Sequence, residues 1–366
     1  MATVSYNPPL PAAGRDEASL RPIAHWLLFC CAMVFAMAVI GAVTRLTESG
    51  LLMVEWKPLI GVLPPLSNAE WERVFDLYRQ TPEYRYVNAG MTLDEFRYIF
   101  YWEWFHRLWG HLIGLAFLVP FVWFWLSGRI PRALLAKLIG LFLLGGLQGV
   151  IGWLMVASGL VDRPSVSHYR LAAHLSMAVL IYGLLLWVAL GLLAGESGTR
   201  RPHAHWPDAV RGLRRHAGAA LALVGVTMVW GAFVAGLDAG RIYPEWPLMG
   251  DRLVPAEAWD MRPWWINPLE NHAAVQFVHR WLAVAAALGV LTLVWRTLRR
   301  GAAGPGSDRV RLAGLLLGAG VVGQVGLGIA TLHTGVAIPV AAAHQAGALV
   351  VVALLVWYLS ELTRPG

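Results

Sequence analysis

The sequence predicts an all-α integral membrane protein whose eight transmembrane helices form two parallel-repeat four-helix bundles. Three observations lead to this fold class. First, 57% of the 366 residues are hydrophobic and only 14% are charged, whereas a soluble domain carries about 25% charged residues. Second, the chain contains eight apolar runs long enough to cross a bilayer, which takes about 20 residues. Third, its two halves repeat one pattern of residues.

The eight predicted transmembrane helices follow one another along almost the whole chain. The links after the second, fourth and sixth are rich in Lys and Arg, as in SGRIPRALLAK, whereas those after the third and seventh carry one Arg and none. Because positively charged loops stay in the cytoplasm, both termini are predicted to face the cytoplasm and the odd-numbered links to face outward. The predicted spans are 24–45, 105–127, 133–156, 169–195, 216–237, 275–297, 310–331 and 338–360.

The segments around these helices define the predicted domains. Residues 1–23 hold Pro, Asp and Glu without an apolar stretch, so we interpret them as a cytoplasmic segment and not as a cleavable signal peptide. Residues 196–215 form a basic cytoplasmic linker between an N-terminal half, 24–195, and a C-terminal half, 216–362. The 29 Lys and Arg exceed the 22 Asp and Glu, but they gather in short links, so topology explains them better than binding of nucleic acid.

The first outer link, residues 46–104, contains two helix-start signals. Ser67 is followed by Glu70 and Thr92 by Glu95, both with capping-box spacing and both ahead of aromatic and apolar residues. We therefore expect two short amphipathic helices near the outer surface; the alternative is a plain solvated loop.

The internal repeat recurs in the same order along both halves. GAVTRLTESGLLMVEWKPLIG (41–61) aligns with GAFVAGLDAGRIYPEWPLMG (231–250) at a constant shift, pairing Gly41 with Gly231 and Glu48 with Asp238. Each half has four spans, an even number, so both enter the membrane from the same side and form a parallel repeat. Further matches join FHRLWG (105–110) to VHRWLA (278–283), LQGVIG (147–152) to GQVGLG (323–328), and two AAH triplets.

Four of the twelve histidines recur at equivalent positions of the repeat. His106 matches His279 and His174 matches His344, and each lies near the start of a span that begins at the outer face. Two imidazoles from facing helices of a bundle can hold a haem iron axially, whereas zinc prefers three or four ligands. The pattern predicts one haem-sized site per half; the alternative for each residue is a hydrogen-bonded packing histidine.

Arginine follows the first repeated histidine in both halves, as Arg107 and Arg280. A guanidinium matches a carboxylate bidentately, so these residues are candidate partners of haem propionates. Arg45, at the outer end of the first span, is a third candidate of the same kind. Snorkelling into the lipid headgroups is the alternative.

The two halves differ beside the first histidine. Glu103 precedes His106 by three residues, on the same helix face, and the equivalent residue of the second half is Gln276. A carboxylate can accept a proton or stabilise a developing positive charge, and an amide cannot. Glu103 is therefore the candidate catalytic residue of the first half; the alternative is an acid at the membrane surface.

With these residues identified, the chain resembles the haem A synthase family, which oxidises haem O for cytochrome oxidase assembly. The resemblance extends from about Ala24 to Leu362 and is most specific in TRLTESGL, MVEWKPLIG, EWFHR and AAHQAG. The long first outer loop resembles the mitochondrial and alphaproteobacterial branch. Other branches carry a cysteine pair in an outer loop, whereas the only cysteines here, Cys30 and Cys31, lie adjacent inside an apolar run.

The resemblance implies a role for each repeated residue. His106 and His174 would bracket the substrate haem O, and His279 and His344 would ligate a resident haem b. Glu103, in the family's EXXHR pattern, would be catalytic. The implied reaction is stepwise oxidation of the C8 methyl of haem O to a formyl group, through an alcohol and a hydrated aldehyde.

Two other functions compete with this interpretation. A bis-histidine dihaem electron carrier would place its haems on opposite sides of the bilayer, whereas all four histidines are predicted toward one side. A haem transporter is the second alternative. The predicted location is a bacterial inner membrane, ahead of a mitochondrial one, with membrane lipid, haem O synthase, cytochrome oxidase assembly factors and an electron donor of unknown identity as candidate partners.

Overall fold

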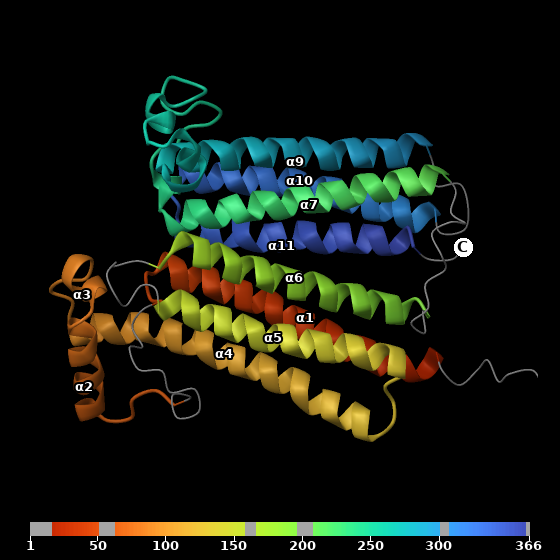
Figure 1. Cartoon of the computed structure of the whole chain (residues 1–366), viewed down its shortest axis with the longest axis horizontal. Coiled ribbons are helices and arrows are strands. Elements are labelled where there is room, and N and C mark those ends of the chain that lie inside the picture. Colours follow the sequence, from red (N-terminus) through yellow and green to blue (C-terminus); the bar gives the residue numbers. More distant parts are fainter. Residues whose placement is uncertain (1–16, 51–62, 158–165, 196–207, 301–306, 364–366) are drawn as a thin grey trace, which may run out of the picture.

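The computed structural model describes residues 17–50, 63–157, 166–195, 208–300 and 307–363. Eight of its helices are long and apolar enough to cross a membrane, which confirms the predicted class (Figure 1). The secondary structure of the described part is helical apart from turns and one isolated bridge. The eight helices are α1 (Glu17–Leu46), α4 (Leu93–Leu126), α5 (Arg132–Ala157), α6 (His168–Leu193), α7 (Asp208–Gly236), α9 (His272–Arg300), α10 (Ser307–His333) and α11 (Ile338–Glu361).

The long helices pack as two groups of four that lie side by side. In the first group α1 contacts α4 and α6, and α5 contacts α6; in the second α9 contacts α7 and α10, and α10 contacts α11. Helices α6 and α7 join the groups, and α11 also packs against α1 and α6 (Figure 1). One large apolar core runs through both groups.

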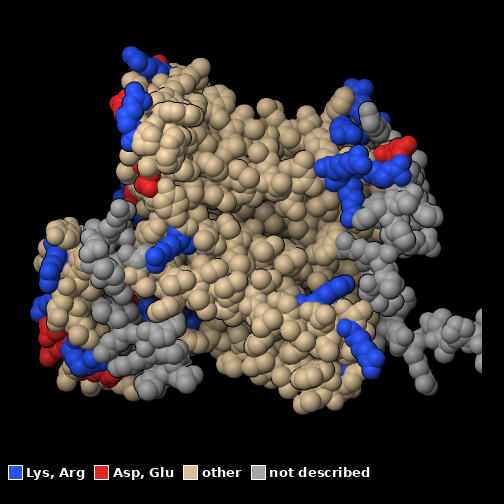
Figure 2. Space-filling model, in the orientation of Figure 1, with Lys and Arg blue, Asp and Glu red and all other residues tan. Residues whose placement is uncertain are grey.

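Many large apolar side chains point outward along the helices. Side chains of this size are exposed on every long helix after α1, including Trp125, Trp153 and Trp295. Figure 2 shows the corresponding surface as a broad band with little charge, with mostly Lys and Arg at one end and a more even mixture of both signs at the other. A bilayer would cover this band. The more basic end holds the start of α7 and the end of α9, as the predicted orientation requires, although the orientation itself stays a prediction.

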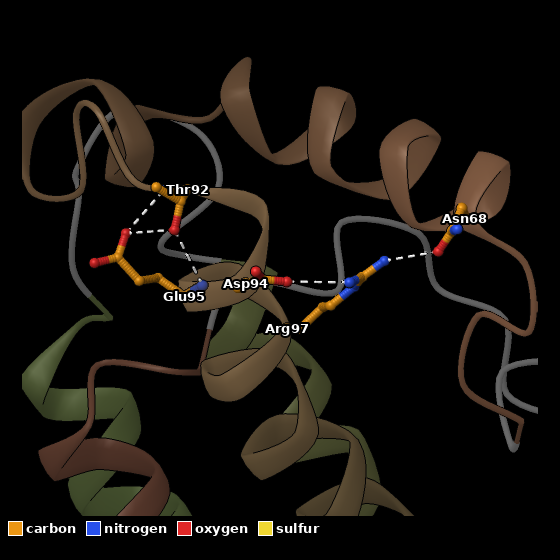
Figure 3. Close-up of polar contacts among 5 residues, drawn as sticks. All are labelled: Asn68, Thr92, Asp94, Glu95 and Arg97. Carbon is orange, nitrogen blue, oxygen red and sulfur yellow. Dashed lines mark hydrogen bonds and ion pairs between the residues drawn. The ribbon is translucent and has the colours of Figure 1, made fainter.

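Helix α4 begins 12 residues before the predicted span, at Leu93. Thr92 accepts a hydrogen bond from the backbone N–H of Glu95, and the Glu95 carboxylate accepts one from Thr92 N–H in return, as Figure 3 shows. The sequence from Leu93 to Trp109 contains neither Pro nor Gly, so the helix begun at this capping box continues into the membrane. The expectation of a separate second amphipathic helix was therefore wrong.

The first outer link contains two shorter helices before α4. Helix α2 (Asn68–Arg79) begins at the predicted cap, Ser67, and buries an aromatic face against the start of α4. A side-chain contact joins the same elements, because Arg97 donates to both Asp94 and Asn68 (Figure 3). Helix α3 (Pro82–Tyr86), capped by Thr81, was not predicted.

The repeat is visible in the backbone as well as in the sequence. Glu48 follows α1 and Asp238 follows α7, and both adopt the left-handed conformation, with φ of 54° and 51°. Non-glycine residues are uncommon there, so the shared conformation supports the alignment of the two halves.

Candidate functional site

The four repeated histidines come from the second and fourth long helices of each group. His106 lies on α4 and His174 on α6, and their charged forms would repel each other. His279 on α9 and His344 on α11 interact in the same way. The structure thus brings together the two pairs that the repeat predicts, one pair within each half.

Every one of these imidazoles lies against a glycine of a neighbouring helix. A Cβ atom added to that glycine would lie between 2.8 and 3.0 Å from Cε1 of the histidine ring. The pairs are Gly41 with His106, Gly152 with His174, Gly231 with His279 and Gly328 with His344.

In the second half both Nδ1 atoms have hydrogen-bond partners. Nδ1 of His279 lies 3.1 Å from the carbonyl oxygen of Thr227 on α7. Nδ1 of His344 lies 3.1 Å from the side-chain amide of Gln324 on α10, which also donates to the His344 carbonyl. His279 can donate Nδ1–H to the Thr227 carbonyl, which keeps the lone pair of Nε2 for a metal. At His344 the Gln324 amide donates to Nδ1 instead, so this bond orients the ring without selecting that tautomer.

In the first half neither Nδ1 atom has a partner among the described residues, although both atoms are buried. Gln148 on α5, the counterpart of Gln324, donates to the His174 carbonyl at 3.1 Å and lies 3.4 Å from Nε2. The imidazoles of the first half are therefore held less firmly than those of the second.

Glu103 lies inside the protein, with 3% of the residue exposed, which excludes an acid at the surface. It forms an ion pair with Arg107, one helical turn further along α4. Both residues make further interactions. The guanidinium offsets part of the free-energy cost of burying this carboxylate.

The counterpart of Glu103 has a different environment. Gln276 is buried, and its amide nitrogen lies 3.4 Å from the Gly240 carbonyl and 3.1 Å from the Tyr243 carbonyl. It therefore fastens α9 to the outer link that follows α7. This link, residues 237–271, folds into short helices that were not predicted: η2 (Ala239–Arg241), η3 (Ala256–Trp259), η4 (Trp264–Ile266) and α8 (Asn267–Glu270).

The three candidate arginines lie in three different settings. Arg280 is buried and donates to the carbonyl oxygens of Tyr243, Glu245 and Leu248, at 2.6 to 3.0 Å. Arg45 pairs with Asp238 at 3.0 Å and donates to the Ala235 carbonyl, so it joins the two halves. Arg107 pairs with Glu103, and contact of any of the three with a propionate stays a prediction.

Sequence reasoning missed a second buried acid near Glu103. Glu83 on α3 is 4% exposed, and its Oε2 atom has no hydrogen-bond partner within the described residues. Burial raises the pKa of this carboxyl from 4.5 to about 8, with smaller contributions from the negative charges of Glu103 and Glu48, opposed by Arg45. Its place in a short helix of an irregular link gave no periodic signal.

Glu83 should make the packing of α3 depend on pH. Its folded-state pKa is raised, so the carboxyl binds a proton more tightly folded than unfolded, and stability falls as pH rises from about 4.5 to about 8. Hydrogen exchange of residues 68–86, corrected for intrinsic rates, should show less protection at pH 8.5 than at pH 6. Glu83→Gln should flatten the difference; an unchanged pH dependence in that variant would contradict the assignment.

The residues present fit two haem groups. Each half offers two half-buried imidazoles from facing helices, and in the second half a carbonyl at Nδ1 of His279 leaves Nε2 of that ring for iron. The described residues contain no cluster of three or more His, Cys, Asp or Glu arranged to hold a metal ion. Two nitrogen ligands per half suit axial ligation of a haem iron better than a zinc site.

Fold and site together define a polytopic membrane protein with two similar halves, each bearing a histidine pair suited to haem. The chain belongs to the cytochrome oxidase assembly protein family (COX15-CtaA), whose profile matches residues 24–356. The predicted family is thereby confirmed.

Curated relatives match this chain over nearly its whole length. It is 60% identical over 357 residues to a protein named heme A synthase of Rhodospirillum centenum, covering 97% of this chain and 92% of that one. Proteins of the same name from Parvibaculum lavamentivorans and Nitrosospira multiformis are 48% and 47% identical. The alignment with the Parvibaculum protein covers 98% of this chain and 99% of that protein. The alignment with the Nitrosospira protein covers 94% of each.

Proposed function

We propose that this protein is a haem A synthase, a membrane oxidoreductase that converts haem O to haem A. The observation that carries the proposal is the buried Glu103–Arg107 pair beside His106, which the second half replaces with Gln276 and a loop-bound Arg280. A duplicated electron carrier has no use for this difference, whereas an enzyme that transforms a ligand in one half does. The names of the relatives agree with this reaction.

In this proposal the first half binds the substrate. His106 and His174 bracket haem O, and their Nδ1 atoms, which have no hydrogen-bond partner among the described residues, suit a ligand that must leave as product. A carbonyl or carboxylate bonded to Nδ1 raises the basicity of the other ring nitrogen and fixes the ring. Without such a partner among the described residues, the imidazoles of the first half hold iron less tightly.

The second half holds a resident haem b between His279 and His344. Both ligands are oriented by hydrogen bonds, to the Thr227 carbonyl and to Gln324. When bound, haem b supplies an electron carrier next to the substrate half. Helices α1, α6 and α11, which pack against one another across the two groups, place the two histidine pairs in adjoining bundles.

Glu103 acts on the methyl carbon that is oxidised. With water as the oxygen source, conversion of a methyl group to an alcohol releases two protons and two electrons, which a bound haem b would pass on to an external electron acceptor. The Glu103 carboxylate stabilises the positive charge that develops at this carbon and orients water beside it. Arg107 holds the carboxylate in place from the next turn of α4. A second oxidation gives the hydrated aldehyde, and loss of water gives the formyl group.

The decisive experiment is chromatographic analysis of haems from a host that makes haem O but no haem A, with and without this protein. A new haem A peak supports the proposal. Bound haem b without haem A or an oxidised intermediate, despite a working electron-transfer partner, would favour the electron carrier. Haem that accumulates unchanged on one side of the membrane would favour the transporter.

We also propose a location and partners. The eight spans and the bacterial relatives fit a multi-pass protein of the bacterial inner membrane. Basic residues at the more positive end are suited to anionic lipid. Haem O synthase and cytochrome oxidase assembly factors are the proteins that the proposed pathway would bring into contact with it.

A further inference from the structure

The glycines beside the four histidines form one repeated contact. A Cβ atom would lie 3.0 Å from Cε1 at Gly41, 2.8 Å at Gly152, 3.0 Å at Gly231 and 2.9 Å at Gly328. Real Cβ atoms almost never come closer than 3.0 Å, as one would at Gly152 and Gly328, and at Gly41 and Gly231 the ring would have to give way by a few tenths of an ångström. Each imidazole therefore occupies space that any other residue on the neighbouring helix would fill.

Close packing of helices does not explain this contact by itself. Small residues allow membrane helices to approach each other, and that alone would explain a single glycine. Here the nearest atom is Cε1 of a repeated histidine in all four cases. Three glycines of the same helices, Gly149, Gly218 and Gly326, would meet nothing within 4 Å of an added Cβ. Gly236 and Gly320 are also closely packed, but against His168 and Leu354, which are not repeated histidines.

A second contact fixes the histidines of α6 and α11. Gln148 and Gln324 lie one turn before Gly152 and Gly328 on the same helices, and each donates to the backbone carbonyl of the adjacent histidine, at 3.1 and 2.9 Å. These bonds hold α5 in register with α6, and α10 with α11. The glycine is thereby kept opposite the imidazole ring.

We propose that Gly41, Gly152, Gly231 and Gly328 are positioning residues that fix the direction of each iron-ligating imidazole. The inference rests on the proposed function, since it takes the four histidines as haem ligands. Cε1 lies between the two ring nitrogens, so a ring whose Cε1 edge rests on bare helix backbone has its rotation set. A methyl group at the glycine would push this edge away and turn Nε2 from the iron, and displacements of about 0.5 Å already disrupt such sites.

The test uses matched alanine variants of the second half. Gly231→Ala and Gly328→Ala should retain haem b about 10–100-fold less well than wild type and should lose the low-spin absorption and paramagnetic resonance spectra of bis-histidine ligation. Gly218→Ala and Gly326→Ala place the same substitution on the same helices and should keep both. Haem per protein and the two spectra are the readouts, measured on monodisperse protein.

The first half provides an internal control for folding. Gly41→Ala and Gly152→Ala should leave the haem b spectrum unchanged and weaken binding of added haem O, with Gly149→Ala as the neutral match. Wild-type spectra in Gly231→Ala and Gly328→Ala would overturn the positioning role while leaving the proposed function intact. Equal loss of haem b in the matched variants Gly218→Ala and Gly326→Ala would also overturn the positioning role, because it would show that any added methyl group disturbs helix packing. Wild-type protein without haem b would overturn the proposed function and this inference with it.

Discussion

Glu103→Gln is expected to lower the formation of haem A by about 10²-fold or more, the range for loss of an acid–base group. The amide cannot accept a proton or carry the negative charge that a developing cation requires. It keeps the shape of the side chain and can still accept a hydrogen bond from Arg107. The variant should therefore fold and keep haem b, because the second half does not contain Glu103. Haem A and haem O are quantified by chromatography of extracts from the haem O-producing host.

The matched control for this variant is Asp94→Asn on the same helix. Asp94 is exposed and, among the described residues, its ion pair is with Arg97 at the start of α4, so the same change of charge there should leave haem A formation near that of wild type. Full haem A formation by Glu103→Gln would show that the Glu103 carboxylate has no catalytic role. Loss of haem b together with haem A would instead indicate a structural role for the carboxylate.

The fold could be predicted from the sequence because each of its signals is local. Apolar length marks each span, and the capping residues Ser67 and Thr92 mark the helix starts that the structure shows. Local signals could not show that the helix begun at Thr92 continues into the membrane. For this reason the first part of α4 was predicted as a separate amphipathic helix. Helix α3 and the short helices of residues 237–271 rest on turns and on side chains such as Gln276 and Arg280 that bind distant carbonyls.

The site residues that could be predicted are those that the comparison of the two halves identifies. His106 and His279 were recognised because they recur, and Glu103 because its counterpart differs. Gly152 and Gly328 recur equally well, but their contact with an imidazole depends on which helices become neighbours. The periodic sequence carries no signal for that choice. Glu83 does not recur, and its burial arises from the fold of the outer link over the start of α4.

His279→Leu is expected to remove the resident haem b and to abolish haem A formation with it. Leucine offers no lone pair to the iron, and a single remaining imidazole, His344, binds haem far more weakly than two. The protein should still insert and fold, because the residue replaced is half-buried and its hydrogen bond within the described residues is to a backbone carbonyl. The purified variant is analysed for haem per protein and for the low-spin spectrum.

His106→Leu is the matched variant in the first half, and the comparison separates the roles of the two histidine pairs. It should keep haem b and its spectrum while it loses binding of haem O and formation of haem A. The same substitution at equivalent positions of the repeat thus predicts opposite results for haem b and the same result for haem A. If both variants lost haem b, the two halves would not be independent sites. If His106→Leu alone lost it, the assignment of substrate and cofactor to the halves would have to be reversed.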